Sequence, residues 1–451
     1  MAITRRKFLQ GMGVGSAALA AACGGSGDGG ATGGPGGGGG TPPTPLPADP
    51  VLVIVNLDGG NDWLNMLPPS SGANRTAYDA KRPTLGIPGA GLVDLGGGIG
   101  LSTDFTGMDE LHAAGRVAWI PGIGMNNPNL SHFVSIDLWG QGSASPDGTG
   151  WLGRFADGAF SPTGDVLRGV TVTNDLPVML KGGSRAFVSI SSASGFVYPA
   201  WLRSNRIGNP FDPQLLETAY GVAVNAAPPA GASAPGFAAA ASVGKLFLDA
   251  QNGFGVDGTL TARTPAVPYP GEAAYPVKKL DGSNLPSSLG NQLKLVAQMI
   301  AAGLPGQVYF TRIGGWDTHS NEATDHPNLM RTLGGSIRAF LADLDTVTTP
   351  AGKASDRVMV MGYSEFGRRV AENKGGTDHG TAGLAFCVGN AVRGGIHGTY
   401  PDLADLDKNG NMKFTVDYRS LYATVLERWL GVGAAATDAS LGAMYPRLGF
   451  L

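Results

Sequence analysis

The sequence predicts an α/β fold with a mainly parallel central sheet and helices on both faces. Its first strand-like segment, residues 51–57, is a continuous apolar run rich in β-branched residues, which is typical of a strand buried on both faces of a parallel sheet. Two segments with apolar residues at helical spacing, 292–302 and 329–344, each precede a strand-like run, 307–313 and 357–361. Because helix and strand alternate in this order, we expect βα units.

The other elements follow from the same patterns. Residues 116–122 predict a strand, and residues 131–139 predict a helix with Asn129 or Ser131 as its cap. Alternation at 170–173 and 187–190 predicts short strands, and residues 418–430 predict a late helix. Residues 227–288 show little periodicity apart from 238–248. We interpret about 165–288 as an insertion into a domain that spans 50–451.

Residues 1–23 predict an export signal. Arg5, Arg6 and Lys7 precede a mild apolar stretch at 11–22, which indicates the twin-arginine route for folded proteins. This stretch is too short for a comfortable membrane span. Cys23 follows small residues, so processing either lipidates Cys23 or cleaves at a nearby alanine. We expect a protein of the periplasm, or one lipid-anchored in the cell envelope, that contacts membrane only through the signal or the lipid.

The composition and charge of the chain limit the kinds of partner that it can bind. Residues 24–49 are nearly all Gly, Ser, Thr, Pro and Ala, which predicts a flexible, disordered linker. The chain has 32 Lys+Arg and 35 Asp+Glu, and without the three basic residues of the signal the balance is 29 − 35 = −6. We therefore expect no nucleic-acid partner. Cys387 lies in an apolar run and is interpreted as a buried small hydrophobe.

Carboxylates and histidines follow the predicted strands in glycine-rich segments. The carboxyl ends of parallel strands meet at one edge of a sheet, where binding loops gather. Imidazole and carboxylate side chains there suit a divalent-metal site or an acid/base site. Asp58 is either a ligand or a turn residue, and Asp378-His379 is either part of a site or a loop cap. The residues expected to converge are Asp58, Ser131, Asp317, His319, Glu365, Asp378 and His379.

Six motifs stand at or near the predicted strand ends and helix starts. They are Leu57-Asp58-Gly59-Gly60-Asn61-Asp62, Ser131-His132-Phe133, Asp137-Leu138-Trp139, Gly315-Trp316-Asp317-Thr318-His319, Ser364-Glu365-Phe366-Gly367-Arg368 and Gly376-Thr377-Asp378-His379-Gly380. With these motifs the chain, over about residues 50–450, resembles the bacterial family catalogued as domain of unknown function 1501. That family is related to the alkaline phosphatase and sulfatase superfamily, whose enzymes hydrolyse phosphate or sulfate esters at one or two metals. The resemblance therefore implies an alkaline phosphatase-like fold.

The resemblance also implies roles for individual residues. Ser131 is the best-placed nucleophile, or else a helix cap, and His132 is an acid, a base or a ligand. Arg368 is expected to steady developing charge. Phe366 stands where the superfamily usually has histidine, so one of two metal positions is lost or altered. The implied metal-binding residues are Asp58, Asp317, His319, Glu365 and His379, with Asp378 beside the last.

The leading hypothesis is a metal-dependent hydrolase of phosphate or sulfate esters in the cell envelope. Its cofactor is a divalent ion, with Zn²⁺, Mn²⁺ or Ca²⁺ as candidates, and its substrate is a small-molecule or glycan ester. The alternative is a non-catalytic envelope binding protein that retains the fold. A third hypothesis is a metal held for stability alone.

Overall fold

A mixed, mostly parallel β-sheet forms the centre of the computed structural model, which describes residues 47–144, 146–160, 166–185, 187–192 and 263–451. The predicted signal at 1–23 with Cys23, most of the linker at 24–49 and the periodic stretch at 238–248 lie outside these residues. Within them, nine strands form the sheet, in the order β14-β4-β13-β10-β1-β7-β5-β6, with β15 also pairing with β4. The strands are β1 (Val51–Leu57), β4 (Val117–Gly124), β5 (Gly169–Thr171), β6 (Val188–Ser189), β7 (Val308–Ile313), β10 (Val358–Ser364), β13 (Gly383–Gly389), β14 (Gly395–Ile396) and β15 (Val416–Asp417).

One strand runs against the others. β13 pairs antiparallel with both β10 and β4, whereas the remaining neighbours are parallel. Because β13 reverses the direction twice, β4 still runs parallel to β10 and ends at the same edge of the sheet. The prediction of an α/β fold with a mainly parallel sheet is confirmed.

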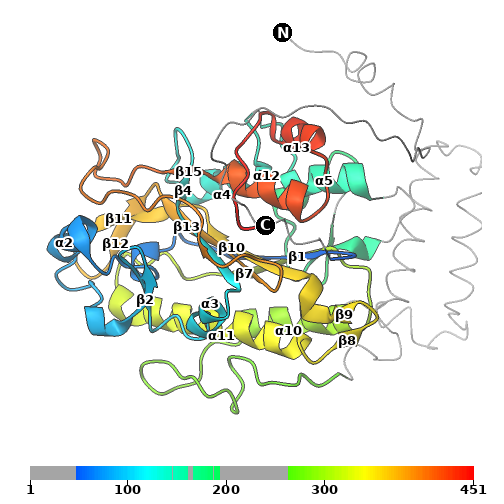
Figure 1. The fold of residues 1–451 in the computed structure, drawn as a ribbon, viewed down its shortest axis with the longest axis horizontal. Coiled ribbons are helices and arrows are strands. Elements are labelled where there is room, and N and C mark those ends of the chain that lie inside the picture. Colours follow the sequence, from blue (N-terminus) through cyan, green and yellow to red (C-terminus); the bar gives the residue numbers. More distant parts are fainter. Residues whose placement is uncertain (1–46, 145, 161–165, 186, 193–262) are drawn as a thin grey trace, which may run out of the picture. The chain divides into compact units, whose positions relative to one another are not determined.

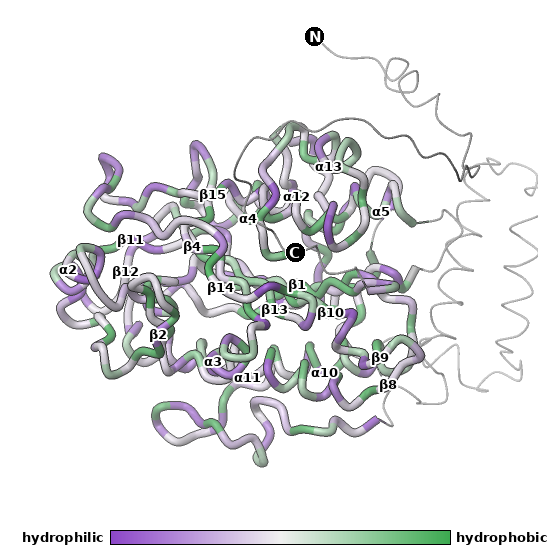
Figure 2. The backbone as a smooth tube through the Cα atoms, viewed as in Figure 1, coloured by the Kyte–Doolittle hydropathy of each residue, from purple (hydrophilic) through white to green (hydrophobic). Residues whose placement is uncertain are grey.

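β1 lies at the centre of the sheet and shows why the apolar run was informative. All seven of its residues are buried, and Figure 2 colours most of the strand as hydrophobic. Val53 and Val55 enter one core, and Leu52 and Ile54 enter the other. Side chains of alternate residues point to opposite faces of a strand, so a strand with cores on both faces needs apolar residues throughout.

Helices cover both faces of the sheet (Figure 1). One face packs on α3 (Met108–Ala113), α10 (Ser288–Ala301) and α11 (Glu322–Leu344). The other face packs on α4 (His132–Gln141), α5 (Trp151–Ala159), α12 (Tyr418–Arg428) and α13 (Ala434–Leu441). No helix in the described ranges has the length and apolar character needed to span a membrane.

Smaller elements complete the described chain. A further helix, α2 (Gly72–Lys81), contacts the strand β11 (Gly367–Glu372). The two-stranded hairpins are β2 (Leu92–Gly96) with β3 (Ile99–Ser102), β8 (Thr348–Thr349) with β9 (Gly352–Lys353), and β11 (Gly367–Glu372) with β12 (Thr377–Gly380). Short 3-10 turns occur at η1 (Trp63–Asn65), η2 (Gly89–Gly91), η3 (Val166–Arg168), η4 (Val178–Leu180) and η5 (Ala354–Arg357).

Within the described residues, the predicted strands and helices coincide with observed ones, with small shifts at their ends, except that α11 begins at Glu322, seven residues before the predicted stretch 329–344. Residues 307–313 and 357–361 fall on β7 and β10, and residues 131–139 fall on α4. The short strands expected at 170–173 and 187–190 overlap β5 and β6. These two extend the central sheet beyond β7, so the described start of the predicted insertion belongs to the sheet itself.

Candidate metal centre

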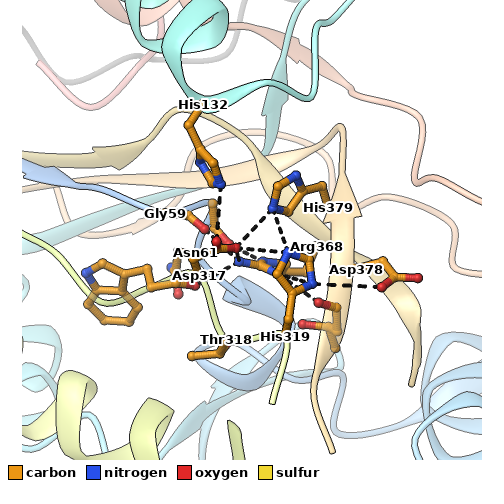
Figure 3. Close-up of polar contacts among 12 residues, drawn as sticks. Gly59, Asn61, His132, Asp317, Thr318, His319, Arg368, Asp378 and His379 are labelled. Atoms are coloured by element: carbon orange, nitrogen blue, oxygen red, sulfur yellow. Dashed lines mark hydrogen bonds and ion pairs between the residues drawn. The ribbon is translucent and has the colours of Figure 1, made fainter. Parts of the chain in front are cut away.

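The site lies at the carboxyl edge of the sheet, where several loops meet (Figure 3). Asp317 lies in the loop after β7, and Glu365 directly follows β10. His132 is the first residue of α4, which follows β4. His379 comes from β12, in the hairpin between β10 and β13. Four separate stretches of the chain therefore supply one group of side chains, as the parallel topology predicts.

Two glycines allow the loops to approach this closely. Gly59 has φ +129°, and a Cβ built there would lie 2.4 Å from the backbone nitrogen of Asp317. Gly376 approaches the same loop from another side, and a Cβ there would lie 2.3 Å from the carbonyl oxygen of Thr318. A side chain at either position would push the Asp317 loop away.

His132 and His379 both direct a ring nitrogen at Asp317. The Nε2 atom of His379 lies 3.0 Å from Asp317 Oδ1, and Nε2 of His132 lies 3.5 Å from Asp317 Oδ2. One ligand atom from each of these three residues lies within 4.8 Å of the other two. Such a group is able to hold one metal ion.

The second ring nitrogen of each histidine is fixed by an oxygen. His132 Nδ1 lies 2.7 Å from Glu365 Oε1, and His379 Nδ1 lies 2.9 Å from the carbonyl oxygen of Leu130. A carbonyl only accepts, so Nδ1 of His379 carries the proton, and the carboxylate imposes the same tautomer on His132. With a metal bound in place of the Nε2 proton, each neutral ring would present its Nε2 lone pair on the side of Asp317. Histidines that bind metals are held in this way.

Glu365 is built into the site as a buried acceptor. Its side chain is 1% exposed, and it accepts hydrogen bonds from the backbone nitrogen of Gly59 and the hydroxyl of Ser364. Its hydrogen bond to His132 raises the pKa of that imidazole against the opposing effect of partial burial. Glu365 therefore contacts the three-residue group through His132, whereas the sequence predicted that it would be a ligand.

His319 adjoins the group on its open side. Its Nε2 atom lies 3.0 Å from Nε2 of His379 and 3.1 Å from Asp317 Oδ1. The ring is 45% exposed. Partial burial and the charge of Arg368 lower the pKa of His319, which favours the neutral imidazole. His319 is thus available either as a fourth ligand or as a proton acceptor.

Arg368 lies beneath the site, where it contacts no solvent. Its fully buried guanidinium donates to Asp317 Oδ1 at 2.6 Å and to the carbonyl oxygens of Gly59 and Thr377, both at 2.7 Å. It also donates to the carbonyl oxygens of Gly60 and Trp316. The sequence predicted a charge-stabilising role beside Glu365. The structure pairs Arg368 with Asp317 and with the backbone of three loops, a place that suits positioning.

The same contacts explain the ionisation of Asp317. Burial alone raises the pKa of this carboxyl, but hydrogen bonds from His379 and Arg368 outweigh it and lower the pKa to about 2. Asp317 is therefore a carboxylate at neutral pH, the form that binds a metal.

Asp58 and Asp378 lie outside the three-residue group. Asp58 forms an ion pair with Arg312, 2.8 Å between Oδ2 and Nε, and accepts a hydrogen bond from Asn56. Burial raises the pKa of Asp58 to about 6, which Arg312 partly offsets. Asp378 is 52% exposed, and its carboxylate lies 3.9 Å from His319 Nδ1. The predicted ligand set is therefore brought together only in part.

Ser131 directly precedes His132 in sequence, and Phe366 contacts the rings of His132 and His379. Ser131 is the N-cap of α4, as one of the predicted alternatives requires, but its side chain makes no capping hydrogen bond. The ring of Phe366 packs 4.9 Å from that of His132 and 4.7 Å from that of His379. Phe366 therefore forms an apolar wall against both imidazoles, in the place where the resemblance led us to look for histidine.

The donor set fits a borderline transition metal better than calcium. The Nε2 atoms of His379 and His132 lie 3.0 and 3.5 Å from the two different oxygens of Asp317, and one ligand atom from each residue lies within 4.8 Å of the others. Two imidazoles and one carboxylate with a free position form a catalytic zinc ligand set, and manganese also accepts them. Calcium prefers oxygen ligands throughout.

The sequence did not single out three buried residues that lie below this group: Asp62, Arg82 and Glu322. Asp62 closes one of the motifs that carry the family resemblance, which was the one available signal. Glu322 gave none, because a glutamate in the first turn of a helix is ordinary.

The chain was compared with known proteins and with family models. No curated protein matches the chain. Residues 278–440, which include Asp317, His319, Glu365 and His379, match the model of the family described as "Protein of unknown function (DUF1501)".

Proposed function

We propose that this chain is a metal-dependent hydrolase of phosphate or sulfate esters, with His132, Asp317 and His379 as the ligands of one ion. The observation that carries the proposal is the matched orientation of the two histidines. Each anchors Nδ1 on an oxygen and turns Nε2 toward Asp317. Zinc is the preferred ion and manganese the second.

Each residue then has a distinct task. The bound ion would polarise an ester oxygen and lower the pKa of a hydroxyl or water. The neutral His319 would accept a proton at Nε2, on the open side of the group. Ser131 is the candidate nucleophile because its hydroxyl makes no bond to the helix that it caps. The N-terminus of α4 would favour the anionic ester beside it.

The finer assignments belong to the same proposal. We infer an alkaline phosphatase-like fold, because the ligands follow the ends of parallel strands. We infer a single metal, because Asp58 is held by Arg312 and Phe366 offers no ligand atom. Export by the twin-arginine route, to the periplasm or to a lipid anchor at Cys23, rests on the sequence of residues 1–23.

Metal content and turnover test the proposal directly. Purified full-length chain loaded with Zn²⁺ should retain about one equivalent after desalting, and His132→Ala, Asp317→Ala and His379→Ala should each lose it. His397→Gln is the matched control, because His397 bonds the carbonyl oxygen of Arg393 instead. The loaded chain should hydrolyse 4-nitrophenyl phosphate or sulfate. Equally low metal content in wild type and all variants would refute the metal site.

A non-catalytic envelope binding protein is the second candidate function. The buried guanidinium of Arg368 favours it, because Arg368 already neutralises Asp317 at 2.6 Å and opposes a bound cation. This candidate predicts no turnover of either ester with Zn²⁺ or Mn²⁺. A large Zn²⁺-dependent rise in melting temperature without turnover would instead favour a metal held for stability.

A further inference from the structure

A buried polar cluster lies directly behind the loops that carry the candidate ligands. It is formed by Asp62 after β1, Arg82 after α2 and Glu322 at the start of α11. Asp62 is fully buried, and the other two side chains are nearly so. Burying three ionisable groups is costly unless each finds a partner, so their arrangement must be accounted for.

Glu322 joins the two loops that hold the candidate ligands. Its Oε2 accepts the hydroxyl of Thr318 at 3.1 Å and that of Thr377 at 2.7 Å. Thr318 lies between Asp317 and His319, and Thr377 lies two residues before His379. One carboxyl oxygen therefore fixes the spacing of both loops.

The other half of the Glu322 carboxyl faces Asp62. Among the described groups no donor reaches Oε1, and the side chain is within hydrogen-bonding contact of the Asp62 carboxylate. Two ionised carboxylates cannot hydrogen-bond, so one of them must carry a proton.

Arg82 decides which carboxyl carries it. Its guanidinium donates hydrogen bonds to Asp62 from two nitrogens, and one of these nitrogens lies 2.7 Å from Oδ1. This pairing outweighs burial and lowers the pKa of Asp62. Burial and the neighbouring charge of Asp62 raise the pKa of Glu322. The proton therefore belongs to Glu322.

We propose that Glu322 is a positioning residue of the metal site and acts as a neutral acid, donating to Asp62 while it accepts Thr318 and Thr377. This inference rests on the proposed metal site, and it adds a requirement that the ligands alone do not state. The distance between Asp317 and His379 depends on a proton held one layer below them.

Substituting glutamine or alanine for Glu322 distinguishes the need for a neutral hydrogen-bonding side chain from the need for any side chain at this position. Glutamine copies the neutral acid, since its amide donates to Asp62 and its oxygen accepts both hydroxyls. With Zn²⁺ as the probe on full-length chain, Glu322→Gln should bind within about 3-fold of wild type, whereas Glu322→Ala should bind 10–100-fold more weakly. Thr377→Val, which removes one hydroxyl at constant shape, should weaken binding about 10-fold. Glu110→Gln is the control, because Glu110 is an exposed partner of Arg338.

The protonation state has its own readout, which does not require metal. The infrared difference spectrum between wild type and Glu322→Gln at pH 7 should contain the carbonyl band of a protonated carboxylic acid, lost in the variant. Absence of that band overturns the inference. So does wild-type Zn²⁺ affinity in Glu322→Ala or, if that variant does not fold, in Thr377→Val. A wild-type chain that shows the band but binds no Zn²⁺ would refute the proposed function and leave the buried acid established.

Discussion

The Nδ1 atom of His132 lies 2.7 Å from Oε1 of Glu365, although 233 residues separate the two in sequence. The contact turns the free nitrogen of His132 toward Asp317 and gives the ligand a buried anionic support. Such outer partners orient a ligand and increase its basicity.

Replacing this support should weaken metal binding without unfolding the chain. Glu365→Gln still offers an oxygen to His132 but loses the charge, so we expect a 10-fold or greater rise in the Kd for Zn²⁺. Competition with a chromophoric chelator measures this constant. Glu110→Gln should leave it unchanged, because Glu110 is 61% exposed on α3. A wild-type Kd in Glu365→Gln would show that His132 needs no anionic partner.

Gly59→Ala should destabilise the fold through the Asp317 loop. The new Cβ would meet the backbone nitrogen of Asp317 at 2.4 Å, at φ +129°. We expect the free energy of unfolding to fall by about 2–4 kcal/mol, from strain and overpacking together. Gly97→Ala isolates the backbone cost, since Gly97 has φ +62° with nothing within 4 Å, and should lose only about 1 kcal/mol. Urea denaturation that gives equal losses would contradict the close approach.

His326 should make the fold sensitive to acid. Its imidazole is buried, its Nε2 lies 2.9 Å from Asn61 Oδ1, and burial lowers the pKa from 6.5 to about 4. Between these values the unfolded chain binds the extra proton, so stability falls as pH drops from 6.5 toward 4. The loss amounts to about 3 kcal/mol over that window.

A variant isolates this contribution from those of other groups. His326→Gln keeps a donor for Asn61 but does not titrate. Urea denaturation at pH 7 and pH 4.5 should therefore show a smaller acid loss in the variant than in wild type. Parallel losses in the two proteins would mean that His326 does not stay neutral in the fold.

Ser131→Ala tests the candidate nucleophile. Because the hydroxyl makes no capping bond, its loss should change the free energy of unfolding by less than about 0.5 kcal/mol. Turnover of the ester substrate should fall by 100-fold or more if Ser131 attacks it. Ser135→Ala should instead lower the free energy of unfolding more than it lowers turnover, since Ser135 is buried and donates to the carbonyl oxygen of Glu365 at 2.7 Å. Unchanged turnover in Ser131→Ala would point to water as the nucleophile.

Local sequence patterns predicted the central sheet because a buried strand needs apolar residues. β1 is apolar throughout, since both of its faces are covered. The direction of β13 was not predictable in this way, because a buried run has the same composition whether it pairs parallel or antiparallel. It depends on the connection from β10, which contains a hairpin and no helix among its residues.

The site was only partly predictable, because its partners are distant in sequence. Asp317 and His379 stood out as strand-end or loop residues of the right chemistry. Nothing local linked Asp58 to Arg312, with which it forms an ion pair. The burial of Arg368 was equally hidden, since an arginine on a short strand is usually exposed.

The reversed strand β13 also separates what is fixed in this architecture from what is free to change. The chain leaves β10 and enters β13 at the same edge of the sheet, so only the β11–β12 hairpin is needed between them. Gly376 and Thr377 hold that hairpin against the Asp317 loop, so a change at its tip would move the loops of the site without altering any register in the central sheet. Descendants of this chain could therefore remodel the rim beside His379 while inheriting the scaffold intact.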